Sequence, residues 1–486
     1  MPPHTCNSHT PRPARAESAK EQAQEYFTQA VAGRESLIGK LNAANHRMLE
    51  GQAELVDGTA RFIGPRKVAV DTADGELIIT AETVVLGTGA VPARPDIPGI
   101  DLPRVYDSTS IQHADPLPQR LAIIGGGFIG LEFAQMFQHF GSQVTVLDSG
   151  EPFLRRAGPV VAESVHQVLT KSGVVVRQSA RVQQIRQDGE ALVLELADGL
   201  VQADAVLVAA GRTPATADLN LEAAGIETDD RSFVAVDDQL RTSAEGVYAV
   251  GDVNGGPQFT YISLDDHRIV WDQLIGSGQR SRADRVAVPS TTFLTPPLSQ
   301  VGMGPEEAVR AGHSVLYAAK DVASIAAMPR PKIVGETDGV ITFTVDAQTR
   351  QVLGASLFCI DSQELINLVA LALRVQVTAD ELMNGIWTHP SSTEALNEVL
   401  GELQPYSGES ASDSGSPVGA PATPEDQSAA RSSSTASSAS VDSRCGQWRC
   451  PSRIRSWALG MSSARRRALS GGVTWSSAPC STNVGG

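Results

Sequence analysis

The stretch of sequence that decides the fold is Leu121-Ala122-Ile123-Ile124-Gly125-Gly126-Gly127-Phe128-Ile129-Gly130-Leu131-Glu132. An apolar run leads into glycines and then into helix-forming residues, which predicts a buried strand, a tight turn and a helix. Of the three spaced glycines, Gly125 permits the turn, Gly127 lets the backbone approach a pyrophosphate, and Gly130 lets the helix pack closely on the strand. The pattern therefore predicts a dinucleotide-binding unit.

An acidic residue follows at the position that such a unit needs. Asp148 ends the apolar run 144–147, downstream of the glycine turn. A carboxylate there accepts hydrogen bonds from the ribose hydroxyls of NAD and repels a 2′-phosphate. Arg155 and Arg156 follow shortly and leave NADPH open, so the sequence favours NADH without excluding NADPH. The structural alternative is a glycine-rich turn with a capping aspartate.

Composition limits the function classes. The 486 residues give room for about three domains. The net charge of -16 argues against nucleic-acid binding, because it repels phosphates, and small molecules are expected as substrates. No run approaches the roughly 18 apolar residues of a membrane span. The five scattered cysteines favour a reducing cytoplasm over secretion, and no metal site is expected.

The chain predicts an α/β organisation with distinct parts. Residues 19–49 have the spacing of an amphipathic helix, and alternation over 121–212 predicts a mostly parallel sheet covered by helices. A helix is expected from about residue 264, and an α+β segment from 286 to 405. The shorter expected elements are strands at 54–62, 67–71, 76–80, 83–90 and 143–148, and helices at 128–140, 160–172 and 391–400.

Several motifs occur in a fixed order along the chain. They are Thr88-Gly89-Ala90, Gly125 to Gly130 with Glu132, Ala210-Gly211-Arg212-Thr213-Pro214, Ala249-Val250-Gly251-Asp252 and His389-Pro390-Ser391-Ser392-Thr393-Glu394. This order resembles the class I pyridine nucleotide-disulfide oxidoreductases over roughly residues 35–405. The stretch 256–270 further resembles the mercuric-reductase-like branch associated with reactive-chlorine resistance.

The resemblance implies FAD/NAD(P)-binding Rossmann-type domains, with the FAD domain incomplete, and an α+β dimerisation domain. The implied boundaries are 1–115 for a partial FAD-binding domain, 116–240 for the NAD(P)-binding domain, 241–285 for the return of the FAD-binding domain, and 286–405 for the dimerisation domain. Residues 406–486 are rich in Ser, Gly, Ala and Pro and are expected to form a disordered tail. A homodimer that binds FAD and NAD(P)H is therefore expected.

The resemblance also assigns roles to cofactor-binding residues. Asp252, beside Gly251, is implied to hydrogen-bond the flavin ribityl chain, and the helix after it to aim its N-terminus at the flavin ring. Such an N-terminus carries partial positive charge, which would stabilise an anionic reduced flavin. Backbone around Ala53, together with Thr88 and Gly89, is implied to line the adenosine half of FAD. Gly211 and Arg212 complete the expected cofactor-binding set, together with Glu132.

His389 and Glu394 are the expected catalytic pair. His389 precedes proline and is expected to be extended, and Glu394 is expected on the first turn of the helix 391–400, where its carboxylate can orient the imidazole. The resemblance implies that the pair serves as acid-base partner of a flavin-side thiol across a dimer interface.

Three features of the family are missing from the sequence. They are an N-terminal Gly-x-Gly-x-x-Gly, a Cys-x4-Cys redox pair on the flavin side, and a lysine facing Glu132, so the chain is expected to be N-terminally truncated and impaired. Cys445 and Cys450 have the Cys-x4-Cys spacing but lie in the expected tail. Cys359 lies in an apolar run and is expected to be a small buried hydrophobe.

The leading functional hypothesis is a flavoprotein oxidoreductase that passes electrons from NAD(P)H to a disulfide, metal ion or oxidised-chlorine-type acceptor. One alternative is a non-catalytic remnant that binds nucleotide without turnover. The other is a dihydrolipoyl-dehydrogenase-like enzyme. Flavin content separates the first two hypotheses, and a panel of acceptors separates the first from the third.

Overall fold

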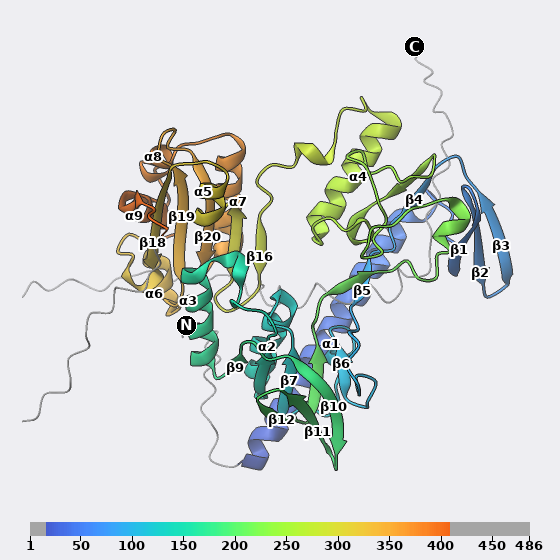
Figure 1. Cartoon of the computed structure of the whole chain (residues 1–486), viewed down its shortest axis with the longest axis horizontal. Coiled ribbons are helices and arrows are strands. Elements are labelled where there is room, and N and C mark those ends of the chain that lie inside the picture. The colour runs from blue at the N-terminus through green and yellow to red at the C-terminus, as the bar shows by residue number, and fades with distance from the viewer. Residues whose placement is uncertain (1–15, 409–486) are drawn as a thin grey trace, which may run out of the picture.

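The computed structural model describes residues 16–408. It has the expected α/β fold, with a parallel sheet in the middle of the chain and an antiparallel sheet near its C-terminal end (Figure 1). The expected tail beyond residue 408, with Cys445 and Cys450, lies outside the described residues.

The glycine stretch belongs to a five-stranded parallel sheet with the strand order β6-β13-β7-β8-β9. Helix α2 follows the glycine turn and α3 follows β8, so the strand and helix alternation agrees with the sequence. A three-stranded antiparallel sheet, β10-β11-β12, packs its apolar side chains against this parallel sheet. The bounds are β6 Val105–Asp107, β7 Arg120–Ile124, α2 Phe128–Phe140, β8 Gln143–Leu147, α3 Pro159–Ser172, β9 Val175–Arg177, β10 Val182–Asp188, β11 Ala191–Leu196, β12 Gly199–Ala203 and β13 Ala205–Val208.

The segments expected to bind FAD form smaller units on either side of this domain in the sequence. The antiparallel sheet β1-β2-β3 is the predicted meander, although β1 begins at Thr59 rather than near residue 54. Strand β4 pairs in parallel with β15, and β5 pairs antiparallel with β14. The bounds are α1 Ala16–Leu49, β1 Thr59–Gly64, β2 Lys67–Thr72, β3 Gly75–Thr80, β4 Val84–Leu86, β5 Ala90–Pro92, β14 Arg212–Pro214, β15 Val247–Ala249 and α4 Thr260–Ile275.

The C-terminal part is a six-stranded antiparallel sheet with helices beside it, in the order β16-β17-β20-β19-β18-β21. Tyr406 donates its N–H to Val315 O and its hydroxyl to Glu306, so ordered contacts continue past the boundary expected at 405. The bounds are β16 Ser290–Thr292, β17 Leu298–Gly302, α5 Pro305–Arg310, β18 Val315–Asp321, α6 Pro329–Val334, β19 Val340–Asp346, β20 Val352–Phe358, α7 Ser362–Arg374, α8 Ala379–Met383, α9 Ala395–Val399 and β21 Gln404–Pro405.

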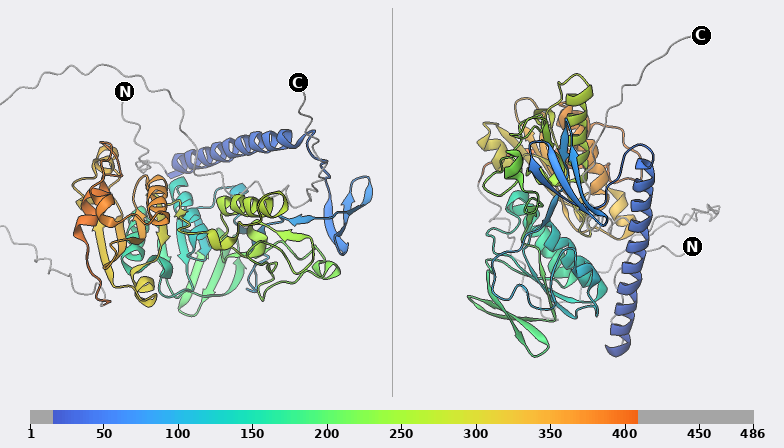
Figure 2. Two further views of the ribbon diagram at one scale, coloured as in Figure 1. Left: turned by 90° about the horizontal axis from the view of Figure 1, so that it is seen from above. Right: turned by 90° about the vertical axis from the view of Figure 1, so that its right-hand side faces the viewer.

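One apolar core joins the parallel-sheet domain to both of its neighbours in sequence. Phe27 of α1 packs on α2, and Leu294 and Phe358 of the C-terminal part belong to the same buried cluster. Helix α1 itself lies along one side of the molecule (Figure 2). This shared core positions the glycine turn relative to the C-terminal sheet.

Two expected helix boundaries are wrong. Helix α4 begins at Thr260 instead of near residue 264. The helix expected at 391–400 is the short α9, which begins at Ala395, so Glu394 is the residue before the helix and not part of its first turn. The reason is that Glu394 accepts a hydrogen bond from the backbone N–H of Ser391, which holds this segment in a turn.

Candidate functional site

The glycine turn between β7 and α2 has the geometry that its sequence predicts. Gly125 has a φ of +112°, where a side chain would be strained. A Cβ on Gly130 would lie 2.0 Å from Gly125 O, so only glycine fits there, whereas nothing lies within 4 Å of a Cβ built on Gly127. The turn is therefore tight on its inner side and open at Gly127, before the N-terminus of α2. Backbone N–H groups at a helix N-terminus bind anions such as a pyrophosphate.

Asp148 lies against this turn. It follows β8, and a Cβ on Gly126 would lie 2.8 Å from its Cγ, so carboxyl group and turn are close neighbours. Its Oδ1 accepts a hydrogen bond from Gly150 N at 3.2 Å. The structure thus brings Asp148 next to the glycine turn, where a dinucleotide would need its ribose partner.

Glu132 contacts the C-terminal part of the chain. Its Oε1 accepts a hydrogen bond from Phe293 N at 2.8 Å, and burial raises the pKa of this carboxyl group while that hydrogen bond opposes the rise. One turn further along α2, Gln135 bonds both Thr295 N and Thr295 O. Helix α2 therefore joins the dinucleotide-binding unit to the start of the C-terminal sheet through Glu132 and Gln135.

A second group of expected cofactor residues meets around β5 and β14. Arg212 Nε lies 3.9 Å from Asp252 Oδ2, and Arg212 also donates to Ala90 O. Gly89 O accepts from Ala215 N, so Thr88 and Gly89 lie beside the same strand pair. The Thr88 hydroxyl is buried and has no hydrogen-bond partner, which is costly unless a ligand supplies one.

Ala53, which is expected to lie near the adenosine half of FAD, follows helix α1. Its N–H donates to Leu49 O at the end of α1, where the side chain is half-buried. Its place in an FAD site stays a prediction.

The turn that carries Asp252 is held by a residue that no motif had identified. Gly251 has a φ of +71°, and its N–H donates to Asp266 Oδ2 at 2.6 Å. Asp266 lies on the apolar face of α4, four residues after Ile262 and three before Ile269, and it is buried like them. An acidic residue on the apolar face of a helix is the sequence feature that could have pointed to Asp266.

His389 and Glu394 meet as predicted. His389 Nδ1 lies 2.9 Å from Glu394 Oε1, and Glu394 Oε2 accepts from Ser391 N. These hydrogen bonds, first that of His389 and then that of Ser391, hold the pKa of the Glu394 carboxyl group below its usual value. The His389 side chain is 72% exposed and that of Glu394 only 15%, so the imidazole faces outward on an anchored carboxylate.

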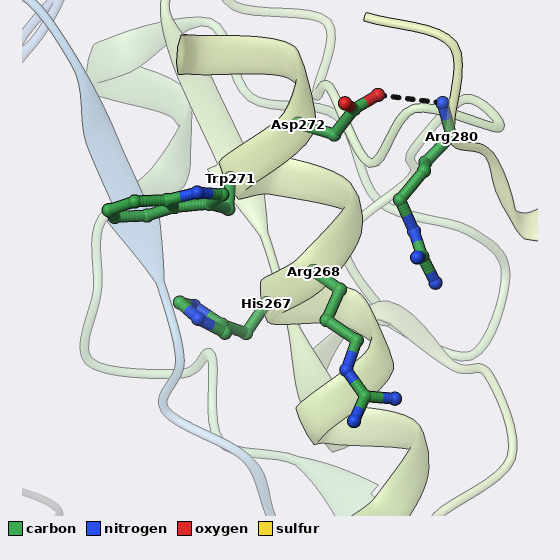
Figure 3. Close-up of a pocket in the computed structure, with 5 residues that line it drawn as sticks. All are labelled: His267, Arg268, Trp271, Asp272 and Arg280. Atoms are coloured by element: carbon green, nitrogen blue, oxygen red, sulfur yellow. Dashed lines mark hydrogen bonds between the residues drawn. The ribbon is translucent and has the colours of Figure 1, made fainter. Parts of the chain in front are cut away.

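Two hollows occur in the described part of the chain. The first, of about 290 Å³, lies beside α4 and includes His267 and Trp271 on one side and Asp272 with Arg280 on another; Arg280 N donates to Asp272 Oδ2 at 2.8 Å (Figure 3). The second, of about 330 Å³, adjoins the segment after His389. Its lining comprises Arg330, Asp361, Glu364, Leu365, Leu368, Pro390, Ser391, Ser392 and Thr393.

Cys359 is completely buried, and desolvation raises the pKa of its thiol strongly, which agrees with the expected small hydrophobe. Across residues 16–408 there is no other free cysteine, and no group of three or more His, Cys, Asp or Glu side chains that could hold a metal ion. In the same part of the chain, none of the helices has the length and apolar character needed to cross a membrane.

Comparison with known families gives two matches. Residues 4–266 match the pyridine nucleotide-disulphide oxidoreductase family, and residues 288–400 match the dimerisation domain of the same family.

Individual relatives agree with these matches. The chain is 40% identical over 377 residues to the probable pyridine nucleotide-disulfide oxidoreductase RclA of Escherichia coli, covering 77% of this chain and 85% of that protein. It is 31% identical over 372 residues to a mercuric reductase of Lysinibacillus sphaericus (75% and 67% covered) and 33% over 381 residues to a dihydrolipoyl dehydrogenase of Thermus scotoductus (76% and 80%). A solved Cu(II) complex of the HOCl-induced flavoprotein disulfide reductase RclA from E. coli has a TM-score of 0.75 at 39% identity, covering 79% of this chain and 88% of that one.

Proposed function

Because the chain belongs to the pyridine nucleotide-disulphide oxidoreductase family, we propose that it is an FAD-dependent oxidoreductase that takes electrons from NAD(P)H, with NADH preferred. Members of this family are NAD(P)H-dependent flavoproteins. The observation that carries the proposal is the position of Asp148 against the glycine turn, since it combines a phosphate-binding backbone with a ribose-binding carboxylate.

The preference for NADH depends on the charges around that turn. Asp148 would repel a 2′-phosphate. Arg155, which could favour such a phosphate, donates to the backbone oxygen of Glu151, and the Glu151 carboxylate accepts from Ser179 in the same region. The Arg155 side chain is therefore hydrogen-bonded within its own loop, and Glu151 adds a second carboxylate to the segment after Asp148, which supports NADH as the better substrate.

The residues around β5 and β14 fit the FAD that the family requires. The buried Thr88 hydroxyl has no partner of its own, and Asp252 and Arg212 face each other beside it. We propose that Thr88, Gly89, Gly251 and Asp252 hold the cofactor, with Ala53 at its adenosine end. When bound, FAD supplies the hydride-accepting and electron-passing chemistry.

His389 and Glu394 are proposed to move a proton. The ionised Glu394 carboxylate accepts from Nδ1–H of His389 and so fixes the tautomer in which Nε2 can take up a proton. The exposed position of the imidazole supports a role toward a partner subunit in a homodimer formed through residues 286–405, where the dimerisation domain matches.

The acceptor belongs to the same proposal. A disulfide, a metal ion or an oxidised-chlorine-type oxidant is proposed, because the similar protein RclA is an HOCl-induced flavoprotein disulfide reductase, and mercuric reductases are also similar. The few scattered cysteines favour the cytoplasm as the compartment.

The experiment that tests the proposal is reconstitution of the purified chain with FAD, followed by assays with NADH and with NADPH. Retention of one FAD per chain after desalting and NADH oxidation that depends on an added acceptor would support a fully active oxidoreductase. An impaired chain, as the sequence leads us to expect, should keep little FAD and turn over slowly. The acceptors would be a disulfide, lipoamide (the oxidised form of dihydrolipoamide), Cu(II), Hg(II) and hypochlorite, each corrected for NADH oxidation without protein. Activity confined to the lipoamide couple would favour the dihydrolipoyl-dehydrogenase-like alternative instead.

A second function is favoured by one observation. Cys359, the free cysteine of the described residues, is buried with a raised pKa, so it does not supply a reactive thiolate. This favours a protein that binds nucleotide without reducing disulfides. A colourless protein that binds NADH but keeps no FAD would establish this second function and contradict the first.

A further inference from the structure

Asp266 is a buried carboxylate with a complete set of partners. Its side chain is 1% exposed. Its Oδ2 accepts from Gly251 N at 2.6 Å and from Asn254 Nδ2 at 3.0 Å, and its Oδ1 is paired with the Arg285 guanidinium. Burying a charge is unfavourable unless it is both paired and hydrogen-bonded, and Asp266 meets both conditions.

These contacts join three segments that are separate in sequence. Asp266 lies on α4, Gly251 and Asn254 belong to the turn after β15, and Arg285 lies in the linker 276–289 that leads to β16. Arg285 is itself largely buried, and its Nε donates to Asp265 Oδ2 at 2.8 Å. The linker to the C-terminal sheet is thus fastened to the same carboxylate as the turn.

The turn has little freedom to move while these contacts persist. Gly251 has a positive φ, and a Cβ there would lie 3.0 Å from Ser263 Oγ, so the backbone lies close against α4. The second N–H of Asn254 Nδ2 serves Ala249 O at 3.1 Å, which ties the turn to the end of β15. Asp252 follows Gly251 directly and is therefore placed by the same contacts.

We infer that Asp266 and Arg285 are positioning residues, which hold the Gly251–Asp252 turn in the conformation that binds the flavin and couple it to the linker of the dimerisation domain. The inference rests on the proposed binding of FAD. Neither residue needs to touch the cofactor, because Asp266 acts through the N–H of Gly251 and Arg285 acts through Asp266.

The first test is the affinity of the full chain for FAD, measured by flavin fluorescence titration. Asp266→Asn and Arg285→Gln should each raise the FAD dissociation constant by about tenfold or more, as expected for loss of a charge-assisted hydrogen bond. NADH affinity should stay unchanged, since the glycine turn lies in another domain, and this checks that the variants fold. Arg285→Lys keeps the charge and should restore part of the affinity.

Arg280→Gln is the matched control. It removes the same charge from the same linker, but Arg280 is half-exposed and reaches Asp265 at 3.0 Å rather than Asp266. Its FAD affinity should stay within about twofold of the unmodified chain, because exposed ion pairs contribute little.

The second test is hydrogen exchange at the amide of Gly251, which requires no cofactor. This amide should exchange faster in Asp266→Asn and Arg285→Gln than in the unmodified chain. Its exchange rate should be unchanged in Arg280→Gln. If Asp266→Asn loses NADH binding, which would show that it does not fold, the comparison of Arg285→Gln with Arg280→Gln decides both tests.

The outcomes separate the inference from the proposed function. If the unmodified chain binds no FAD, the proposed function fails, and the exchange rate at Gly251 alone decides the inference. The positioning role would be overturned if the Asp266 and Arg285 variants had the same FAD affinity as Arg280→Gln. When FAD does not bind, the same exchange rate at Gly251 as in Arg280→Gln would overturn it.

Discussion

Asp266 and Glu132 are carboxylates in different surroundings, and the difference lies in their partners. Asp266 has a guanidinium and two hydrogen-bond donors. Glu132 accepts a hydrogen bond from the N–H of Phe293 and has no cation within ion-pair distance among the described residues, so desolvation dominates and raises its pKa. The Asp266 carboxylate is paired and hydrogen-bonded, whereas desolvation disfavours the ionised form of Glu132.

This contrast predicts the effect of Glu132→Gln. Because the folded-state pKa of Glu132 is raised, its ionisation disfavours the folded state above that pKa, and the cost vanishes below the unfolded value of about 4.3. The neutral glutamine still accepts from Phe293 N. The variant should therefore unfold at a higher temperature than the unmodified chain at pH 8, and the gap should close toward pH 4. A variant that is less stable at pH 8 would contradict the assignment.

A second prediction at the residue scale concerns Asp148. Replacing Asp148→Ala should weaken NADH binding by about 1–3 kcal/mol through lost hydroxyl contacts, while NADPH binding changes less. Isothermal titration with both nucleotides measures this. Asp198→Ala is the control, since Asp198 is 69% exposed and pairs with Arg177 on the surface of the same domain. Equal affinities of the unmodified chain for NADH and NADPH would count against the preference.

Residues with a local signature could be predicted from the sequence, and residues that depend on long-range contacts could not. The roles of Gly125 and Gly130 follow from backbone sterics that their spacing reveals. Glu132 was expected among the cofactor-binding residues, but its partner Phe293 lies far away in sequence. Asp266 shows only as an acid on an apolar helix face, and its partner Arg285 could not be inferred from periodicity.

At the scale of elements, the bounds of a helix could be predicted best where the hydrophobic period and the residues that begin and end a helix agree. Helix α2 has the predicted bounds because Gly127 precedes it and Gly141 ends it in the left-handed conformation. Helix α4 begins earlier than expected because Phe259 is extended and the apolar residues after it already belong to the helix. Helix α9 is shorter than expected because the Glu394 carboxylate accepts a hydrogen bond from the backbone N–H of Ser391, which holds this segment in a turn.

The end of β19 makes a prediction about acid stability. Asp346 accepts from Thr349 N and from His313 Nδ1, and these bonds lower its pKa to about 2. Its contribution to folding is therefore present above the unfolded pKa near 3.9 and is lost as pH falls toward the folded value. Asp346→Asn should lower the unfolding temperature at pH 7, and the difference should shrink below about pH 4.

Thermal unfolding at a series of pH values checks this expectation. Asp188→Asn is the control, because Asp188 is 61% exposed and only 3.5 Å from Arg186. A deficit of Asp346→Asn that stays constant down to pH 3 would show that the carboxylate charge is not what stabilises the turn.

The attachment of α1 gives a further prediction at the element scale. Phe27 is buried against Phe137 and Phe140, with ring centroids 5.7 and 5.1 Å away. Phe27→Ala should destabilise the protein by about 3–5 kcal/mol through loss of buried area and the cavity left behind. The neighbouring Tyr26 is 61% exposed, so Tyr26→Ala is the control and should cost much less. Similar losses for both variants in denaturant unfolding would show that α1 is not anchored through Phe27.

At the scale of the whole molecule, the parts of the proposed site are widely separated in sequence. The nucleotide turn, the Asp252 turn and the His389–Glu394 pair belong to different units of the fold, and the imidazole of the pair points outward. An outward imidazole can act on a flavin only if another surface is brought to it. A second copy of this chain, joined through residues 286–405, would do so.

The last prediction is therefore a homodimer in which His389 serves the partner's flavin. Sedimentation should give a dimer at micromolar concentration, and deletion of residues 409–486 should leave it intact, since the ordered contacts of Tyr406 are kept. Asp252→Ala and His389→Ala should each lack activity, but a mixed dimer of the two contains one subunit with an intact Asp252 turn facing an intact His389. Mixing them after partial unfolding and refolding should restore activity. If the pair acts within its own subunit, every site in the mixture lacks one residue and no activity returns, and a monomer in sedimentation would contradict the prediction before any mixing is done.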